Sequence, residues 1–224
     1  MDWQALALSA KLSLLTTLIL LVVGLPIASW LTFSSWRMKF LVEAVVALPL
    51  VLPPTVLGYY VLVAIGPRSP LGQAFESLTG QRLPFTFKGL LLASVLYSLP
   101  FAVQPFATAF ARVDRQLIEA SWCLGASRLS TFFRVVVPLS ARGIVAGLVL
   151  TFAHTLGEFG VVLMVGGNIP GVTRTISVSI YDDVQALNYA AAGRTALLLL
   201  VVSFAVLVVT YRVQRSAWAT WPQS

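Results

Sequence analysis

Long apolar runs alternate with short polar segments along the chain. The apolar runs cover residues 12–33, 40–66, 89–111, 143–166 and 195–211, and Glu158 interrupts the fourth. A helix needs about 20 apolar residues to cross a bilayer. The first run exceeds the apolar region of a cleaved signal peptide and follows the acidic Asp2, so we expect it to be retained. The pattern predicts an all-α integral membrane protein with five transmembrane helices per chain.

Composition supports a membrane protein and argues against nucleic-acid binding. Hydrophobic residues make up 58% of the chain and charged residues 10%, against about 45–50% and about 25% in soluble domains. The formal net charge is +7, but the basic residues lie dispersed at the ends of apolar runs and form no tract that could follow a phosphate backbone. Cys123 is the only cysteine, which excludes an intrachain disulfide, and we expect it to be a small packing residue.

The basic residues also predict an orientation, because cytoplasmic segments of membrane proteins carry an excess of Lys and Arg. Nine of the fifteen lie between runs one and two, between runs three and four, or after run five. With five spans, these segments share one side. We therefore expect a multi-pass protein of the bacterial cytoplasmic membrane with its amino terminus outside and its carboxyl terminus inside. The semi-polar residues 175–192 would form a surface helix or loop outside.

The cytoplasmic residues 116–138 break the apolar pattern. Residues 116–124 favour a helix, and Gly125 stands where a left-handed carboxyl cap would end it. Ser127 can cap a second short helix, which Pro138 would stop. We predict two short helices joined by a turn.

This segment carries more apolar surface than a solvated loop would keep. Its apolar side chains are Ile118, Ala120, Trp122, Leu124, Leu129, Phe132, Phe133 and Val136. One interpretation is a connector that lies on the lipid headgroups, with arginines meeting anionic lipid. The other is a docking surface for a partner protein, and the pattern supports both.

The spacing within this segment resembles a known motif. Glu119-Ala120-Ser121, three residues, Gly125, nine residues, Val135, one residue and Val137-Pro138 are similar to the EAA motif of binding-protein-dependent ABC importer permeases. The resemblance implies a type I importer permease fold and a coupling segment, at about residues 116–138, that docks on a separate ATPase subunit. The positions that it implies for coupling are Glu119, Ala120, Ser121, Gly125, Arg128 and Pro138. No lysine precedes Ser or Thr as in a phosphate-binding loop, so ATP and Mg would be bound by the ATPase.

Two further stretches narrow the resemblance. LPLVLPPTVLGYYVLV (48–63) and HTLGEFGVVLMVGGNIPG (154–171) are similar to segments of molybdate transporter permeases, with sulfate and tungstate permeases as close kin. The resemblance implies that residues 1–224 form a single permease domain of an ATP-driven oxyanion importer, with molybdate expected and tungstate or sulfate as alternatives. It also implies a homodimer, two ATPase subunits and a separate oxyanion-binding protein.

Prolines and hydroxyl residues inside the runs suggest a pathway for the anion. Prolines 49, 53, 54, 100 and 105 would break helices, and non-helical backbone is tolerated at membrane depth where it lines a cavity. Our candidate pathway residues are Pro53, Pro54, Thr55, Ser98, Pro100, Thr151, Thr155, Gly157 and Glu158. The alternative for each is ordinary kinking or packing between helices. The runs contain no Lys or Arg, which indicates transient passage rather than tight binding.

Other function classes fit less well. His154 and Glu158 are four residues apart, but two ligands make a weak metal site, so we expect no metal and a structural Glu158 paired with His154 or backbone amides. A secondary transporter would show paired broken helices and intramembrane charges. An intramembrane enzyme would need a converging set of catalytic groups. We therefore predict a non-enzymatic transport subunit that binds no cofactor itself.

Overall fold

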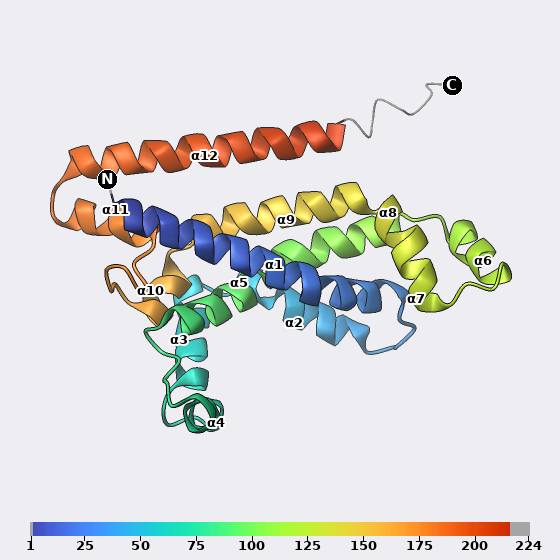
Figure 1. Ribbon diagram of the computed structural model, residues 1–224, viewed down its shortest axis with the longest axis horizontal. Coiled ribbons are helices and arrows are strands. Elements are labelled where there is room, and N and C mark those ends of the chain that lie inside the picture. Colours follow the sequence, from blue (N-terminus) through green and yellow to red (C-terminus); the bar gives the residue numbers. More distant parts are fainter. Residues whose placement is uncertain (1, 216–224) are drawn as a thin grey trace.

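The structure is a computed structural model that describes residues 2–215, and this range contains helices and connecting segments but no strand (Figure 1). The helices are α1 (Trp3–Phe33), α2 (Lys39–Val51), α3 (Pro54–Ile65), α4 (Pro70–Thr79), α5 (Phe87–Ala111), α6 (Arg115–Cys123), α7 (Arg128–Thr131), the π-helical turn η1 (Phe132–Val136), α8 (Val137–Leu139), α9 (Ala141–Leu156), α10 (Gly160–Gly166), α11 (Ile176–Gln185) and α12 (Tyr189–Arg215). Residues 216–224, which complete the predicted domain, lie outside the described residues.

By helix length and apolar composition, up to five crossings can be counted in the described chain. Helices α1, α5 and α12 are each long and apolar enough to span a membrane, and two bent pairs bring the number to five. The pairs are α2 with α3, and the α7–α8 segment with α9. The prediction of an all-α, five-span protein is confirmed. Helices α1, α5, α9 and α12 run along the long axis, while α3 and α4 project to one side (Figure 1).

Two helices begin well before the apolar runs that predicted them. Helix α1 starts at Trp3, where the Asp2 carboxylate accepts a hydrogen bond of 2.9 Å from the Ala5 N–H and caps the helix. Lys11 therefore lies inside α1, with its ammonium group 4.9 Å from the centre of the Phe87 ring. Helix α12 starts at Tyr189. Apolar runs mark the lipid-facing length of a helix, not its polar ends.

The predicted proline breaks are partly wrong. The chain bends by 115° between α2 and α3, at Leu52 and Pro53. Pro49, however, lies inside α2, and Pro100 and Pro105 lie inside the continuous helix α5. Each interior proline removes one backbone hydrogen bond. Helix α5 tolerates this loss because it is packed along its length against α1 and α9.

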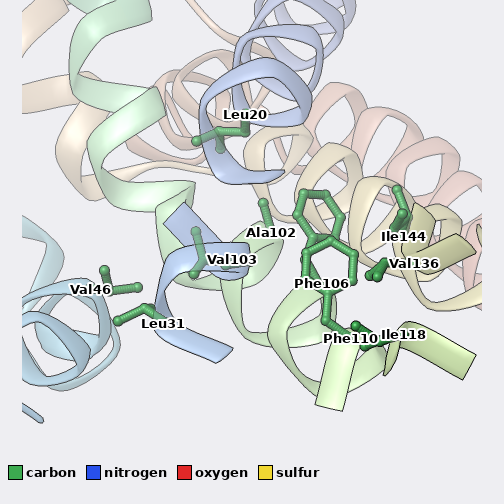
Figure 2. Close-up of a cluster of buried hydrophobic side chains, with 11 residues drawn as sticks. Leu20, Leu31, Val46, Ala102, Val103, Phe106, Phe110, Ile118, Val136 and Ile144 are labelled. Atoms are coloured by element: carbon green, nitrogen blue, oxygen red, sulfur yellow. The ribbon is translucent and has the colours of Figure 1, made fainter. Parts of the chain in front are cut away.

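Glycines allow this close packing around Phe106, the centre of the main core (Figure 2). A Cβ atom added to Gly24 of α1 would lie 3.3 Å from the Phe106 ring, and one added to Gly147 of α9 would lie 2.8 Å from it. Phe106 and Phe110 are fully buried. The two glycines thus hold the ring of α5 between two neighbouring helices.

The two chain breaks meet in space. Helix α9 ends at Leu156, α10 starts at Gly160, and the predicted interruption at Glu158 is confirmed. A Cβ atom on Gly160 would lie only 2.6 Å from Cβ of Pro54, the first residue of α3. The start of α10 and the start of α3 therefore touch, and the irregular backbone of both breaks gathers at one place.

Residues 175–192, expected as a surface helix or loop, contain the helix α11. One face of this helix is buried against α1 and α12, including Ile176, Val178 and Ser179. The Ile176 N–H donates a buried hydrogen bond of 2.8 Å to Ser9 Oγ of α1. The helix thus ties the start of α1 to the last helix.

Candidate transport and coupling sites

A cavity of about 450 Å³ lies where the two chain breaks meet. It is lined by Pro54, Thr55, Tyr97, His154, Gly157, Glu158, Phe159, Gly160, Leu163 and Met164. Four of the predicted pathway residues line this space: Pro54, Thr55, Gly157 and Glu158. Pro53 is exposed at the bend immediately before them. We call this space the break cavity.

The predicted residues Ser98 and Thr155 stand beside it in a chain of hydrogen bonds between α5 and α9, which ends on the backbone carbonyl of Thr151. Thr155 Oγ1 donates to the Thr151 carbonyl over 2.9 Å, because a carbonyl only accepts. Ser98 Oγ must then donate to Thr155 Oγ1, 2.9 Å away. The one remaining role for Ser98 is to accept from His154 Nδ1 at 3.0 Å. The chain fixes the His154 tautomer with its proton on Nδ1.

Glu158 does not pair as the sequence suggested. Its side chain is 4% exposed, and neither carboxylate oxygen has a hydrogen-bond partner among residues 2–215. His154 instead bonds to Ser98 and lies between two aromatic rings, with centroids 3.8 Å from Phe101 and 4.8 Å from Tyr97. The expected pairing with His154 or backbone amides is therefore wrong. Within the described chain, no three His, Cys, Asp or Glu side chains are grouped to hold a metal ion.

A second space of about 600 Å³ runs between α5 and α9 and contains residues that sequence reasoning missed. It is lined by Leu50, Pro100, Phe101, Gln104, Pro105, Thr108, Ala109, Arg112, Arg142, Gly143, Ala146 and Leu150. Pro100 faces this space, which we call the α5–α9 groove. The four-residue spacing of Gln104, Thr108 and Arg112 was the signal that could have revealed it.

The predicted coupling segment consists of two short helices and lies at one end of the bundle (Figure 1). Asp114 caps α6 by accepting from the Gln116 N–H, and Ser127 caps α7 by accepting from the Ser130 N–H. Gly125 joins the helices with a φ of +83°, in the left-handed region that favours glycine. An added Cβ there would meet nothing within 4 Å. Gly125 is therefore required for its backbone angle rather than for space.

One side chain of the EAA motif, that of Ser121, links the two helices. Ser121 Oγ and Thr131 Oγ1 are hydrogen-bonded at 2.9 Å between α6 and α7. Glu119 forms an exposed ion pair of 3.2 Å with Arg115 on its own helix, which stabilises the helix only weakly. Ala120 and Arg128 are exposed.

Two details of this segment differ from the prediction. The chain stays helical through Pro138 to Leu139, because the π-helical turn η1 precedes the proline and Pro138 sits in the first turn of α8, where no N–H is needed. Cys123, expected to be a packing residue, is exposed. It lies at the end of α6, on a segment that is mostly outside the core.

The apolar residues of the segment divide into two faces. Ile118 and Val136 are buried in the main core with Phe110, as Figure 2 shows. The outward residues are Leu117, Trp122, Leu124, Leu129 and Phe133, which are between 47% and 88% exposed. We call these five residues the outer face. The segment is thus anchored to the bundle while presenting apolar surface away from it.

Broken helices around a cavity, with an exposed two-helix segment at one end of a membrane bundle, are the architecture of a helical transporter subunit. A family model described as "Binding-protein-dependent transport system inner membrane component" matches residues 14–217. The chain belongs to this family, the permeases of ABC importers, and is a multi-pass inner-membrane transport subunit.

Individual relatives agree with this placement. The chain is 52% identical over 214 residues to the molybdenum transport system permease protein of Azotobacter vinelandii, covering 96% of this chain and 95% of the relative. It is 40% identical to the corresponding protein of Escherichia coli K12, covering 82% of this chain and 80% of the relative. A solved bacterial ABC transporter involved in alginate import has the same fold, with a TM-score of 0.76 at 18% identity, covering 95% of this chain and 78% of that one.

Proposed function

We propose that this chain is the membrane permease of an ATP-driven importer that moves molybdate from an extracytoplasmic binding protein to the cytoplasm. The observation that carries the proposal is the 52% identity to a molybdenum permease over nearly the whole of both chains. The break cavity supplies hydroxyl groups without a buried Lys or Arg among its lining residues. Such a space can replace part of an anion's hydration without holding the anion tightly.

The proposed assembly is a homodimer joined to two ATPase subunits, which bind ATP and Mg, and served by one binding protein. The apolar outer face of α6, α7 and η1 supports docking on another protein, because a face of this kind is costly in water. The Glu119–Ser121 and Gly125 positions of the EAA motif lie on the same two-helix unit. Arg128 and Pro138 belong to its second half.

The proposed orientation places the amino terminus outside and the carboxyl terminus inside. Figure 1 supports it, because the start of α1 and the α6–α7 segment lie at opposite ends of the bundle, and α12 runs back toward the α6–α7 end. In the proposed cycle, ATP draws the ATPase subunits together, the docked segments move with them, and the helices swing from inward-facing to outward-facing. Hydrolysis then resets the dimer.

Gly125 and Gly80 provide a matched test of coupling. Both glycines end a helix with positive φ, +83° and +67°, and an added Cβ would meet nothing near either. Both N–H groups also donate a backbone hydrogen bond. Proline fixes φ near −65°, so Gly125→Pro and Gly80→Pro should strain their turns similarly. In proteoliposomes with the ATPase and binding protein, only Gly125→Pro should abolish uptake and ATPase stimulation. Intact coupling in Gly125→Pro would show that the assignment is wrong.

The anion is tested by offering molybdate, tungstate and sulfate to the reconstituted importer and measuring competition for uptake. Molybdate uptake that tungstate suppresses and sulfate does not would fit the proposal. Uptake that persists with a hydrolysis-dead ATPase would instead indicate a secondary transporter.

A further inference from the structure

The α5–α9 groove carries a polar stripe along one side. Gln104 and Thr108 on α5, and Arg112 at its carboxyl cap, follow one another at four-residue intervals, and all three are exposed. Residues four apart share a helix face, and eight residues of helix span about 12 Å. Arg142, in the first turn of α9, lines the same groove. The stripe thus ends at two guanidinium groups.

The two arginines form no ion pair within the described chain. The ion pairs of residues 2–215 involve Arg82, Arg115 and Arg174, and none involves Arg112 or Arg142. Asp114 is the carboxylate nearest to Arg112 in sequence, and it caps α6 through the Gln116 N–H at 2.9 Å. The groove end is therefore a site of net positive charge.

The groove lies beside the break cavity. Phe101 lines the groove and His154 lines the break cavity, and their rings are stacked with centroids 3.8 Å apart. From this pair, α5 runs toward the end of the bundle that carries α6 and α7 (Figure 1), and the groove residues Gln104 and Thr108 follow along it. The stacked rings therefore join one lining residue of each space.

We propose that the α5–α9 groove is the inner half of the oxyanion route, and that Arg112 and Arg142 form an anion-binding mouth at its end. The inference rests on the proposed function, because it assumes that the cargo is an oxyanion. Clefts lined by one sign of charge concentrate the opposite ion by 10-fold or more, in a manner that salt weakens. Exposed arginines attract the anion without desolvating it, so it is released into the cytoplasm.

An oxyanion fits this groove better than a lipid headgroup does. Headgroup phosphate could pair with the two arginines, but the acyl chains would then lie along Gln104 and Thr108. Hydrocarbon offers no hydrogen-bond partner to an amide or a hydroxyl, which makes such contact costly. A hydrated oxyanion supplies partners along the whole stripe.

The test uses the complete importer in proteoliposomes, with molybdate as the probe. The variants are Arg112→Gln with Arg142→Gln, the corresponding double Lys variant, and Arg37→Gln as a control that removes an exposed charge outside the groove. We expect the double Gln variant to lose about tenfold in uptake, and the Lys variant and the control to stay close to wild type. High salt should shrink the difference between wild type and the double Gln variant.

Three results would overturn the inference, and a fourth would contradict the proposed function. The inference is overturned by wild-type uptake in the double Gln variant, or by equal loss in the Lys variant, which would indicate a structural role. It is also overturned if the difference disappears in vesicles of purely zwitterionic lipid, since the groove would then bind anionic headgroups. Absence of molybdate uptake by the wild type, with intact ATPase stimulation, would instead contradict the proposed function.

Discussion

The buried hydroxyl groups of Ser98 and Thr151 form hydrogen bonds to different parts of the structure. Ser98 and Thr151 are both fully buried. Ser98 connects α5 to His154 and Thr155 of α9, whereas Thr151 donates over 2.8 Å to the Gly147 carbonyl of its own helix. A buried hydroxyl thus acts between helices in one case and within a helix in the other.

Ser98→Ala should therefore destabilise the protein more than Thr151→Val. Removing Ser98 Oγ leaves the half-buried His154 N–H without its acceptor, at a cost of about 1–3 kcal/mol. Removing the Thr151 hydroxyl leaves a carbonyl that still belongs to the helix ladder, and valine keeps the shape, so we expect a loss below about 1 kcal/mol. Thermal melting of the purified variants in detergent measures both. Equal melting temperatures would contradict the proposed hydrogen-bond chain.

At the scale of elements, glycine positions decide how closely helices approach. Gly147 and Gly143 of α9 face α5, where added Cβ atoms would collide with Phe106 and Ala109. This close approach brings Ser98 within hydrogen-bonding distance of Thr155. It also holds the continuous, proline-containing α5 in place. The packing of α5 on α9 therefore sets the geometry of both the break cavity and the groove.

Gly147→Ala should destabilise the bundle, while Gly193→Ala should not. The added methyl at position 147 would lie 2.8 Å from Phe106 Cε1 and 3.2 Å from Pro105 Cβ, and such overpacking costs about 1–3 kcal/mol. Gly193, inside α12, has nothing within 4 Å of an added Cβ. Alanine there favours the helix by up to about 1 kcal/mol. A lower melting temperature for Gly193→Ala than for Gly147→Ala would refute the packing argument.

At the scale of the whole molecule, the two spaces and the coupling segment follow one another along the bundle. The break cavity and the groove meet at the Phe101–His154 pair. From there α5 runs toward the end of the bundle that carries α6, α7 and η1 (Figure 1). This order places the proposed exit of the anion beside the proposed ATPase contact.

Phe101→Ala should open a connection between the two spaces. We expect molybdate to leak through the reconstituted importer without ATP, because the ring that stacks on His154 at 3.8 Å is gone. Phe33→Ala is a suitable control, since Phe33 stacks on Phe110 at 6.5 Å and lines neither space. The measurement is the ATP-independent flux of molybdate from loaded vesicles. A flux equal to that of the control would show that Phe101 is not the barrier.

Some site residues could be predicted from the sequence because their role is local. Gly125 has the left-handed angle that its position after a helix implied, and Ser127 caps the following helix as expected. Glu158 lies at a break, as the flanking glycines suggested. Its expected partner was wrong, because His154 is taken by Ser98, a residue 56 positions away along the chain. Spacing along one helix gives no information on a competitor from another.

The sequence by itself determined the five spans, the two-helix segment and the family. Hydrophobicity is a property of each stretch, and the bilayer acts as one uniform solvent on every stretch. Only the tertiary structure decided which prolines break a helix, because packing of α5 between α1 and α9 keeps Pro100 and Pro105 helical. It also decided which polar groups meet, since the cavity, the hydrogen-bond chain and the Arg112–Arg142 mouth all join residues that are distant in the chain.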